Sequence, residues 1–146
     1  MIEECIFCEG KLEKYLIKKF EHWIVYLNPQ QYYLGRVYVV LNRHEPENTF
    51  ELTDEEWKEF KEVIDKVTKV LKSLYKYDLM NYLTLQNKDR NHFYMHLIPR
   101  YKDIRIVNGG EEFKDELWGN PPFPSPKKEV EEKLLQKIKE DIQKEL

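Results

Sequence analysis

Residues 53–75 carry the pattern that most restricts how this chain can fold. Thr53 is followed three positions later by Glu56, which is the capping-box arrangement in which each side chain bonds the other residue's backbone N–H. Apolar residues then recur at helical spacing to the end of the segment: Trp57, Phe60, Ile64, Val67, Leu71 and Leu74. The segment is therefore predicted to be a long helix with one apolar face, which a second layer must cover.

That second layer is predicted to be a β-sheet. Runs rich in β-branched and aromatic residues, typical of strands, occupy 15–20, 22–27, 36–42, 79–86 and 92–98. The first two are expected to pair as a meander, and the Asn-Pro and Gly residues of 28–35 indicate a loop. Because the strands precede and follow a single long helix, we predict an α+β domain with an antiparallel sheet of about five strands.

The last third of the chain carries weaker signals. Glycines and prolines are frequent between 102 and 126, so this segment is expected to be irregular. It could reach over a cleft, with Trp118 as a lid or a contact to a second copy, or it could equally be a surface tether for the last helix. A C-terminal helix packed on the sheet is expected to begin at Pro126 and to present an apolar face made by Val130, Leu134, Ile138 and Ile142.

Length and charge narrow the class of protein. The 146 residues fit a single domain spanning 1–146, with a core at 1–101 and a tail at 102–146. The 24 basic and 27 acidic residues are mixed along the chain, so no nucleic acid is expected as a partner. Neither a membrane-spanning run nor a signal peptide is recognisable, and we expect a cytoplasmic protein with no membrane contact.

The predicted strand at 92–98 carries the polar side chains most suited to ligand binding or catalysis. Because side chains alternate across a strand, His92, Tyr94 and His96 share one face, and Arg100 follows at the exit. Imidazoles and a guanidinium arranged in a row suit a phosphate group. The same pattern also fits an ordinary half-exposed strand with polar residues on its wet face.

Four segments resemble the histidine triad (HIT) family. "HFYMHLIPR" at 92–100 is similar to the family motif of three alternating histidines followed by two apolar residues and often Pro-Arg, with Tyr94 at the middle histidine's position. "CIFC" at 5–8, "EHWIVYLNPQQYYLGRVYVVLNRH" at 21–44 and "ELTDEE" at 51–56 match other parts of the family pattern in the same order. The resemblance covers roughly residues 5–101 and is more specific than the triad alone.

The resemblance implies a homodimeric HIT fold that binds a small-molecule nucleotide and hydrolyses or transfers its phosphate linkage. It assigns the catalytic positions to Tyr94 and His96. It assigns nucleotide binding to Asn28, Asn81, Asn87, His96 and Arg100. Asn28 could instead serve only the Asn-Pro turn, and Phe7, Trp23 and Tyr26 could line a base pocket or simply belong to the core.

Tyr94 leaves three functions open. In HIT enzymes the middle histidine attacks the α-phosphorus, whereas a free phenol, with a pKa of about 10, is ionised in only about one molecule in a thousand at neutral pH. The chain could be a hydrolase or transferase acting on dinucleoside polyphosphates or nucleoside phosphoramidates. It could also bind nucleotides without turnover, or act as a zinc-stabilised interaction module.

A separate metal site is also implied. On its own, the C-x-x-C of Cys5 and Cys8 indicates half a metal site or a redox pair. Some HIT relatives complete such a site with the histidine that ends the third strand and the first triad histidine, which are His44 and His92 here. Two cysteines and two histidines suit a structural Zn²⁺ ion. The alternative is two small buried thiols and two ordinary histidines.

Overall fold

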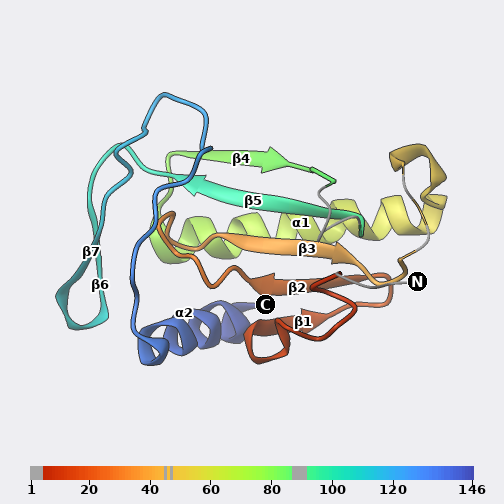
Figure 1. The fold of residues 1–146 in the computed structure, drawn as a ribbon, viewed down its shortest axis with the longest axis horizontal. Coiled ribbons are helices and arrows are strands. Elements are labelled where there is room, and N and C mark those ends of the chain that lie inside the picture. The colour runs from red at the N-terminus through yellow and green to blue at the C-terminus, as the bar shows by residue number, and fades with distance from the viewer. Residues whose placement is uncertain (1–4, 45, 47, 87–91) are drawn as a thin grey trace.

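The sheet and the long helix form two layers. The computed structural model describes residues 5–44, 46, 48–86 and 92–146. Its main sheet is antiparallel with the strand order β1-β2-β3-β5-β4. The strands are β1 (Leu16–Lys19), β2 (Trp23–Leu27), β3 (Val37–Leu41), β4 (Leu79–Leu83) and β5 (Tyr94–Arg100). Helix α1 (Asp54–Tyr75) crosses behind this sheet in Figure 1. The predicted α+β class and the pairing of the first two strands are confirmed.

The capping box fixes the start of α1. The Thr53 hydroxyl accepts from the backbone N–H of Glu56 at 3.1 Å, and the Glu56 carboxylate accepts from the backbone N–H of Thr53 at 2.8 Å. Arg43, two residues beyond β3, adds a two-pronged contact to that carboxylate at 2.7 and 2.8 Å. Because these hydrogen bonds favour the charged form, led by those from Arg43, the pKa of Glu56 falls to about 2. The pair ties the helix start to the end of β3.

The buried face of α1 differs in part from the predicted one. Phe60, Val67 and Leu71 are buried as predicted, whereas Trp57 is 39% exposed and rests its ring 5.7 Å from that of Phe60. Val63 and Tyr75 complete the buried face instead. More than one stripe of apolar residues spaced three and four apart is possible on this helix. The stripe that packs against the sheet is rotated slightly from the predicted one.

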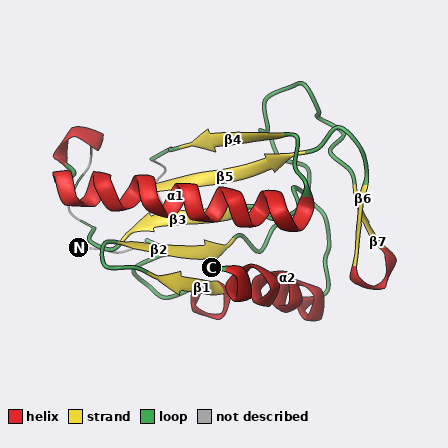
Figure 2. Cartoon of the chain, turned by 180° about the vertical axis from the view of Figure 1, so that it is seen from behind, coloured by secondary structure: helices red, strands yellow, loops and turns green. Residues whose placement is uncertain are grey.

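The C-terminal helix begins later than predicted. Helix α2 spans Glu132–Glu145 and lies beside β1, as Figure 2 shows from behind. A helix start at Pro126 is therefore wrong. The backbone N–H of Lys128 donates to the Gln30 side chain at 3.0 Å, and the Lys128 ammonium pairs with Glu111 at 2.8 Å. These contacts hold the chain extended across the loop before β3.

The segment expected to be irregular contains a hairpin. Strands β6 (Arg105–Val107) and β7 (Glu111–Phe113) pair antiparallel and stand apart from the main sheet. Gly109 and Gly110, with φ of 81° and 86°, supply the left-handed turn that most side chains resist. Short 3-10 turns occur at Glu13–Tyr15, Thr49–Glu51 and Asn108–Gly110. Within the described ranges, no helix has the length and apolar character needed to cross a membrane.

The two faces of the sheet have different partners. Trp23 lies on the face that packs against α1, where its ring is 4.5 Å from Phe60 and its indole N–H donates to the Glu56 carbonyl. Trp23 therefore belongs to the core and not to a pocket shared with Tyr94. The opposite face, here called the triad face, carries Tyr94 and His96. These two residues lie beside Val40 and Tyr38 of β3 in the strand register.

Candidate functional site

The three alternating residues do lie on one face, but that face is covered. Tyr94 and His96 belong to β5, and His92 comes two residues before it. Their exposed fractions are 4% for His92, 0% for Tyr94 and 4% for His96. The predicted shared face is confirmed. The alternative of a half-exposed strand with solvated polar residues is wrong, because other parts of the chain cover the row.

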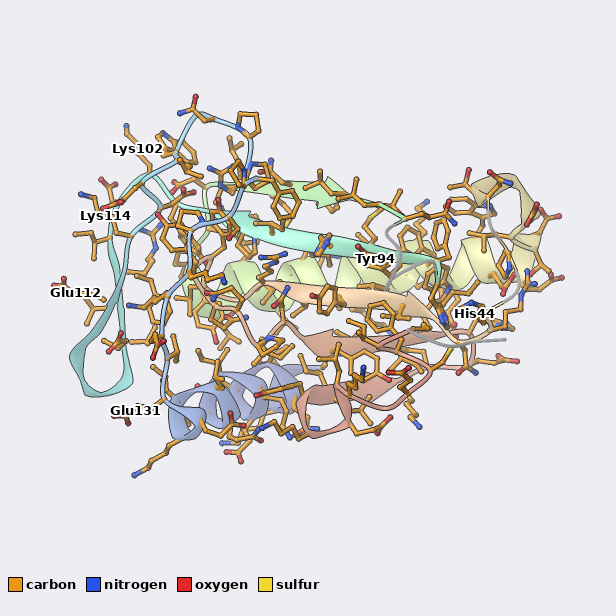
Figure 3. The ribbon with its side chains drawn as sticks, in the orientation of Figure 1. His44, Tyr94, Lys102, Glu112, Lys114 and Glu131 are labelled. Atoms are coloured by element: carbon orange, nitrogen blue, oxygen red, sulfur yellow. The ribbon has the colours of Figure 1, made fainter. Side chains whose placement is uncertain are left out.

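Phe7 covers the middle of the triad face. It lies between the two cysteines of the N-terminal arm, and its ring is 5.3 Å from that of Tyr94 and 5.8 Å from that of His92. Tyr38 approaches Tyr94 from the neighbouring strand at 5.7 Å. Figure 3 shows Tyr94 and His44 toward the same end of the sheet, near the N-terminal arm. Tyr94 therefore sits among aromatic rings rather than at the open floor of a cleft.

His96 lies between aromatic rings and an arginine. Its ring is 5.1 Å from Tyr38 and 5.6 Å from Phe123, which comes from the tail. One terminal nitrogen of Arg36 is 3.4 Å from the Nδ1 atom of His96. Arg36 is not among the residues predicted for the site. The alternation of β3 could have found it, because Arg36 shares a face with Tyr38 and so lies on the same side of the sheet as His96.

Arg100 anchors the tail. Guanidinium carries five N–H donors, and here they bond Asp115 at 2.6 and 3.1 Å, Asn81 at 2.8 Å, and the carbonyls of Leu117 and Asn120 at 2.8 and 2.7 Å. Arg100 and Asn81, both predicted to bind nucleotide, are thus brought together. In this conformation, however, they hold residues 115–120 rather than face a ligand.

Two further contacts hold the tail over the triad face. The Tyr33 hydroxyl donates to the Pro122 carbonyl at 2.7 Å, and the backbone N–H of Glu116 donates to the Tyr32 hydroxyl at 2.9 Å. Burial raises the pKa of Tyr33 to about 12, so its phenol keeps the proton that this bond needs. Residues 115–123 therefore form a segment, here called the strap, that crosses the sheet near His96.

Asn28 and Asn87 are the other residues predicted to bind nucleotide. The Asn28 side-chain oxygen accepts from the backbone N–H of Gln30 at 2.9 Å, which is the Asx turn expected for an Asn-Pro sequence. Asn87 lies outside the described residues. A hollow of about 290 Å³ opens beside Arg100 and is lined by the strap and by β4, including Trp118 and Leu79. Trp118 thus borders this hollow, and Phe123 is the strap residue that contacts His96.

The four predicted metal ligands converge at one end of the triad face. The ligand atoms of Cys5, Cys8, His44 and His92 lie within 4.8 Å of one another. The Cys8 sulfur is 3.2 Å from the His44 Nδ1 and 3.4 Å from the His92 Nδ1, and the two Nδ1 atoms are 3.1 Å apart. Zinc bonds of about 2.0–2.3 Å in a tetrahedron require ligand separations of roughly 3.3–3.8 Å. The group therefore has nearly the spacing that a tetrahedral ion needs.

The orientation of His92 supports the same use. Its Nε2 atom contacts the carbonyl oxygen of Leu41, and a carbonyl can only accept, so the ring proton lies on Nε2. The unprotonated Nδ1 then faces the Cys5 and Cys8 sulfurs, the first at 3.7 Å. A histidine held this way by a backbone carbonyl is a common arrangement at metal sites. The residues present fit a metal ion.

Comparisons with known proteins agree with this architecture. No family model matches the sequence. The sequence is 29% identical over 108 residues to the Bacillus subtilis protein called Protein hit. The match covers 68% of this chain and 72% of that protein. A Sulfolobus tokodaii structure described as a hypothetical histidine triad nucleotide-binding protein matches with a TM-score of 0.67 and 22% identity, over 97% of this chain and 89% of that one.

A second solved structure has the same fold. A zinc-bound histidine triad family protein from Mycobacterium smegmatis matches with a TM-score of 0.64 and 16% identity, over 99% of this chain and 96% of that chain. At such identities the likeness shows the fold.

Proposed function

We propose that this chain, whose fold is that of solved histidine triad proteins, binds a nucleotide on the triad face. The observation that carries the proposal is the pairing of His96 with Arg36, 3.4 Å apart and buried on the face opposite α1. A buried imidazole beside a guanidinium is a donor pair suited to an anionic group. The similar Sulfolobus tokodaii protein is described as nucleotide-binding, which supports the same class of ligand.

The neighbouring residues suit the other parts of a nucleotide. Phe7 and Tyr26 lie on the triad face with ring centres 6.2 Å apart, and aromatic faces of this kind stack on a base. Asn28 follows β2 on the same side of the sheet and is our candidate for the ribose hydroxyls. Arg100 and Asn81 would contribute to nucleotide binding indirectly, by holding the strap in place. Ligand entry requires Phe123 to move away from His96.

Binding without rapid turnover fits Tyr94 better than hydrolysis or transfer does. A phenol must lose its proton to attack phosphorus, and charge is costly to form where water is excluded. Tyr94 is 0% exposed and packs against the rings of Phe7 and Tyr38. We therefore propose that the family's phosphate chemistry is weak or lost in this chain while recognition is retained.

Calorimetric titration with AMP, GMP and diadenosine tetraphosphate tests the proposal. At a ligand concentration 100 times the dissociation constant, binding should stabilise the fold by about 2.7 kcal/mol and raise the melting temperature accordingly. His96→Ala should weaken binding by about 10-fold or more, whereas His22→Ala, a histidine at the β1–β2 turn, should bind like the wild type. If the wild type binds none of the three compounds, a zinc-stabilised interaction module becomes the better account.

We propose that the Cys5, Cys8, His44 and His92 group holds one structural Zn²⁺ ion. Four protein ligands leave no open position for substrate water, so the ion would stabilise and not react. When bound, it would pin the N-terminal arm, and with Phe7 the cover of Tyr94, to the strand at His92. Thiolate ligands also need a reducing environment, which suits a cytoplasmic protein.

We propose that two copies of the chain associate through β4. This strand is at the edge of the sheet, and its Leu79 and Tyr82 side chains are 58% and 51% exposed. An apolar edge strand that remains uncovered is a liability, and antiparallel pairing with a second β4 would extend the sheet. Light scattering should show twice the chain mass for the wild type and the single-chain mass for Tyr82→Lys. A monomeric wild type at micromolar concentration would contradict this arrangement.

A further inference from the structure

The two ends of the strap are held by bonds of different strength. At its first end, Arg100 bonds the Asp115 carboxylate and two backbone carbonyls. These bonds come from a charged donor, and such bonds are about twice as strong as neutral ones. At its second end, the neutral hydroxyl of Tyr33 donates to the Pro122 carbonyl at 2.7 Å. Residues 121–123 are therefore the part of the strap that leaves the sheet at the lower cost.

The sequence of this second end explains why a side chain must hold it. Four of the six residues in "PPFPSP" at 121–126 are prolines, and a proline has no backbone N–H to donate. A ladder of backbone hydrogen bonds therefore cannot form along the segment, whereas its carbonyls can still accept. Tyr33 is well placed to donate, because it is 0% exposed and its ring centre lies 5.0 Å from the guanidinium carbon of Arg100.

Phe123 is the side chain that this second end places over the triad face. Its ring centre is 5.6 Å from that of His96 and 5.4 Å from the guanidinium carbon of Arg36. A nucleotide bound at His96 would occupy the space of this ring, so the ring must leave before the ligand can bind. The measured affinity is then reduced in proportion to the fraction of molecules in which the ring is displaced.

We infer that Tyr33 is a positioning residue for nucleotide binding, because its hydroxyl controls, through Pro122, how often Phe123 leaves His96. This role rests on the proposed nucleotide binding and gives that site a control that does not touch the ligand. Removing one neutral hydrogen bond should raise the open fraction by about 3- to 10-fold. While the closed form dominates, the apparent affinity rises by the same factor. A residue that only supported the fold would leave the affinity unchanged or lower it.

Binding kinetics of Tyr33→Phe with AMP test this role. The change removes the hydroxyl and keeps the ring, so AMP should bind about 3- to 10-fold more tightly than to the wild type. The gain should come from a faster on-rate at an unchanged off-rate, because opening precedes binding. Tyr101→Phe is the matched control, since it removes a buried hydroxyl that donates to the Leu34 carbonyl at 2.6 Å. It should lower the melting temperature similarly without changing AMP affinity.

A second variant tests whether Tyr33 acts through the ring of Phe123. Phe123→Ala should itself tighten AMP binding, and adding Tyr33→Phe to it should change the affinity by less than about twofold. In the absence of ligand, the NMR signals of the His96 ring report how often the Phe123 ring faces it. In Tyr33→Phe these signals should lie between those of the wild type and those of Phe123→Ala.

The outcomes separate the role of Tyr33 from nucleotide binding itself. If the wild type binds AMP and Tyr33→Phe binds it equally or more weakly, the role is overturned and nucleotide binding stands. An effect of Tyr33→Phe that persists in full beside Phe123→Ala would also overturn the role, as would His96 signals identical to those of the wild type. A wild type that binds no nucleotide would overturn both.

Discussion

Removing the metal is expected to destabilise the protein strongly. Zinc at 1,000 times its dissociation constant stabilises a fold by about 4 kcal/mol, which corresponds to roughly 10 °C in melting temperature for a chain of this size. Dialysis against a strong chelator should therefore lower the melting temperature by about that amount, and adding Zn²⁺ should restore it. The effect is expected because a bound ion would join the arm at Cys5 and Cys8 to His44 and His92, which lie far along the chain.

A pair of histidine variants makes this result specific. His44→Ala removes one of the four ligands and should lower both the metal content and the melting temperature. His22→Ala removes a histidine that lies outside the metal group and should change neither. Purified wild-type protein should carry about one zinc per chain by elemental analysis. A metal-free preparation with the same melting curve as the zinc-loaded one would contradict the proposed site.

Replacing Tyr94 by histidine is expected to produce phosphate chemistry that the wild type lacks. A phenol at neutral pH is less ready to attack than a neutral imidazole by about 4 kcal/mol, or roughly 1,000-fold in rate. Tyr94→His should therefore release AMP from diadenosine tetraphosphate or adenosine phosphoramidate at least about 100-fold faster than the wild type. Chromatographic quantification of AMP gives the rates, at substrate concentrations that saturate both proteins.

Tyr94→Phe is the matched control for that experiment. It removes only the hydroxyl and keeps the ring that packs against Phe7 and Tyr38. If the wild type is a binding protein, Tyr94→Phe and the wild type should share the same low rate and similar nucleotide affinity. Measurable wild-type turnover that Tyr94→Phe abolishes would show that the phenol is the nucleophile, and the chain would then be a hydrolase or transferase.

Local sequence patterns predicted an element correctly where the pattern is compatible with a single structure. The Thr53–Glu56 capping box set the start of α1, and the alternation of 92–98 placed Tyr94 and His96 on one face. Patterns that are compatible with several structures predicted the structure less well. The apolar spacing of α1 allowed more than one stripe, and Pro126 is as compatible with the extended chain that Lys128 anchors as with a helix start.

The candidate site depended on contacts that no local pattern encodes. Family likeness brought together Cys5, Cys8, His44 and His92, which the structure confirms as one group. The cover over the triad face comes from Phe7 and Phe123, at opposite ends of the chain. Arg100 carries the Pro-Arg signal of the family motif but binds Asp115, a partner 15 residues away that only the folded tail supplies. Long-range partners of this kind cannot be read from local sequence patterns.

A crystal structure of the protein grown with AMP tests the central claim most directly. The account predicts the phosphate within hydrogen-bonding distance of His96 and Arg36, the Phe123 ring displaced, and the Arg100–Asp115 contact unchanged. Density for AMP on another surface, with Phe123 still packed on His96, would contradict nucleotide recognition on the triad face.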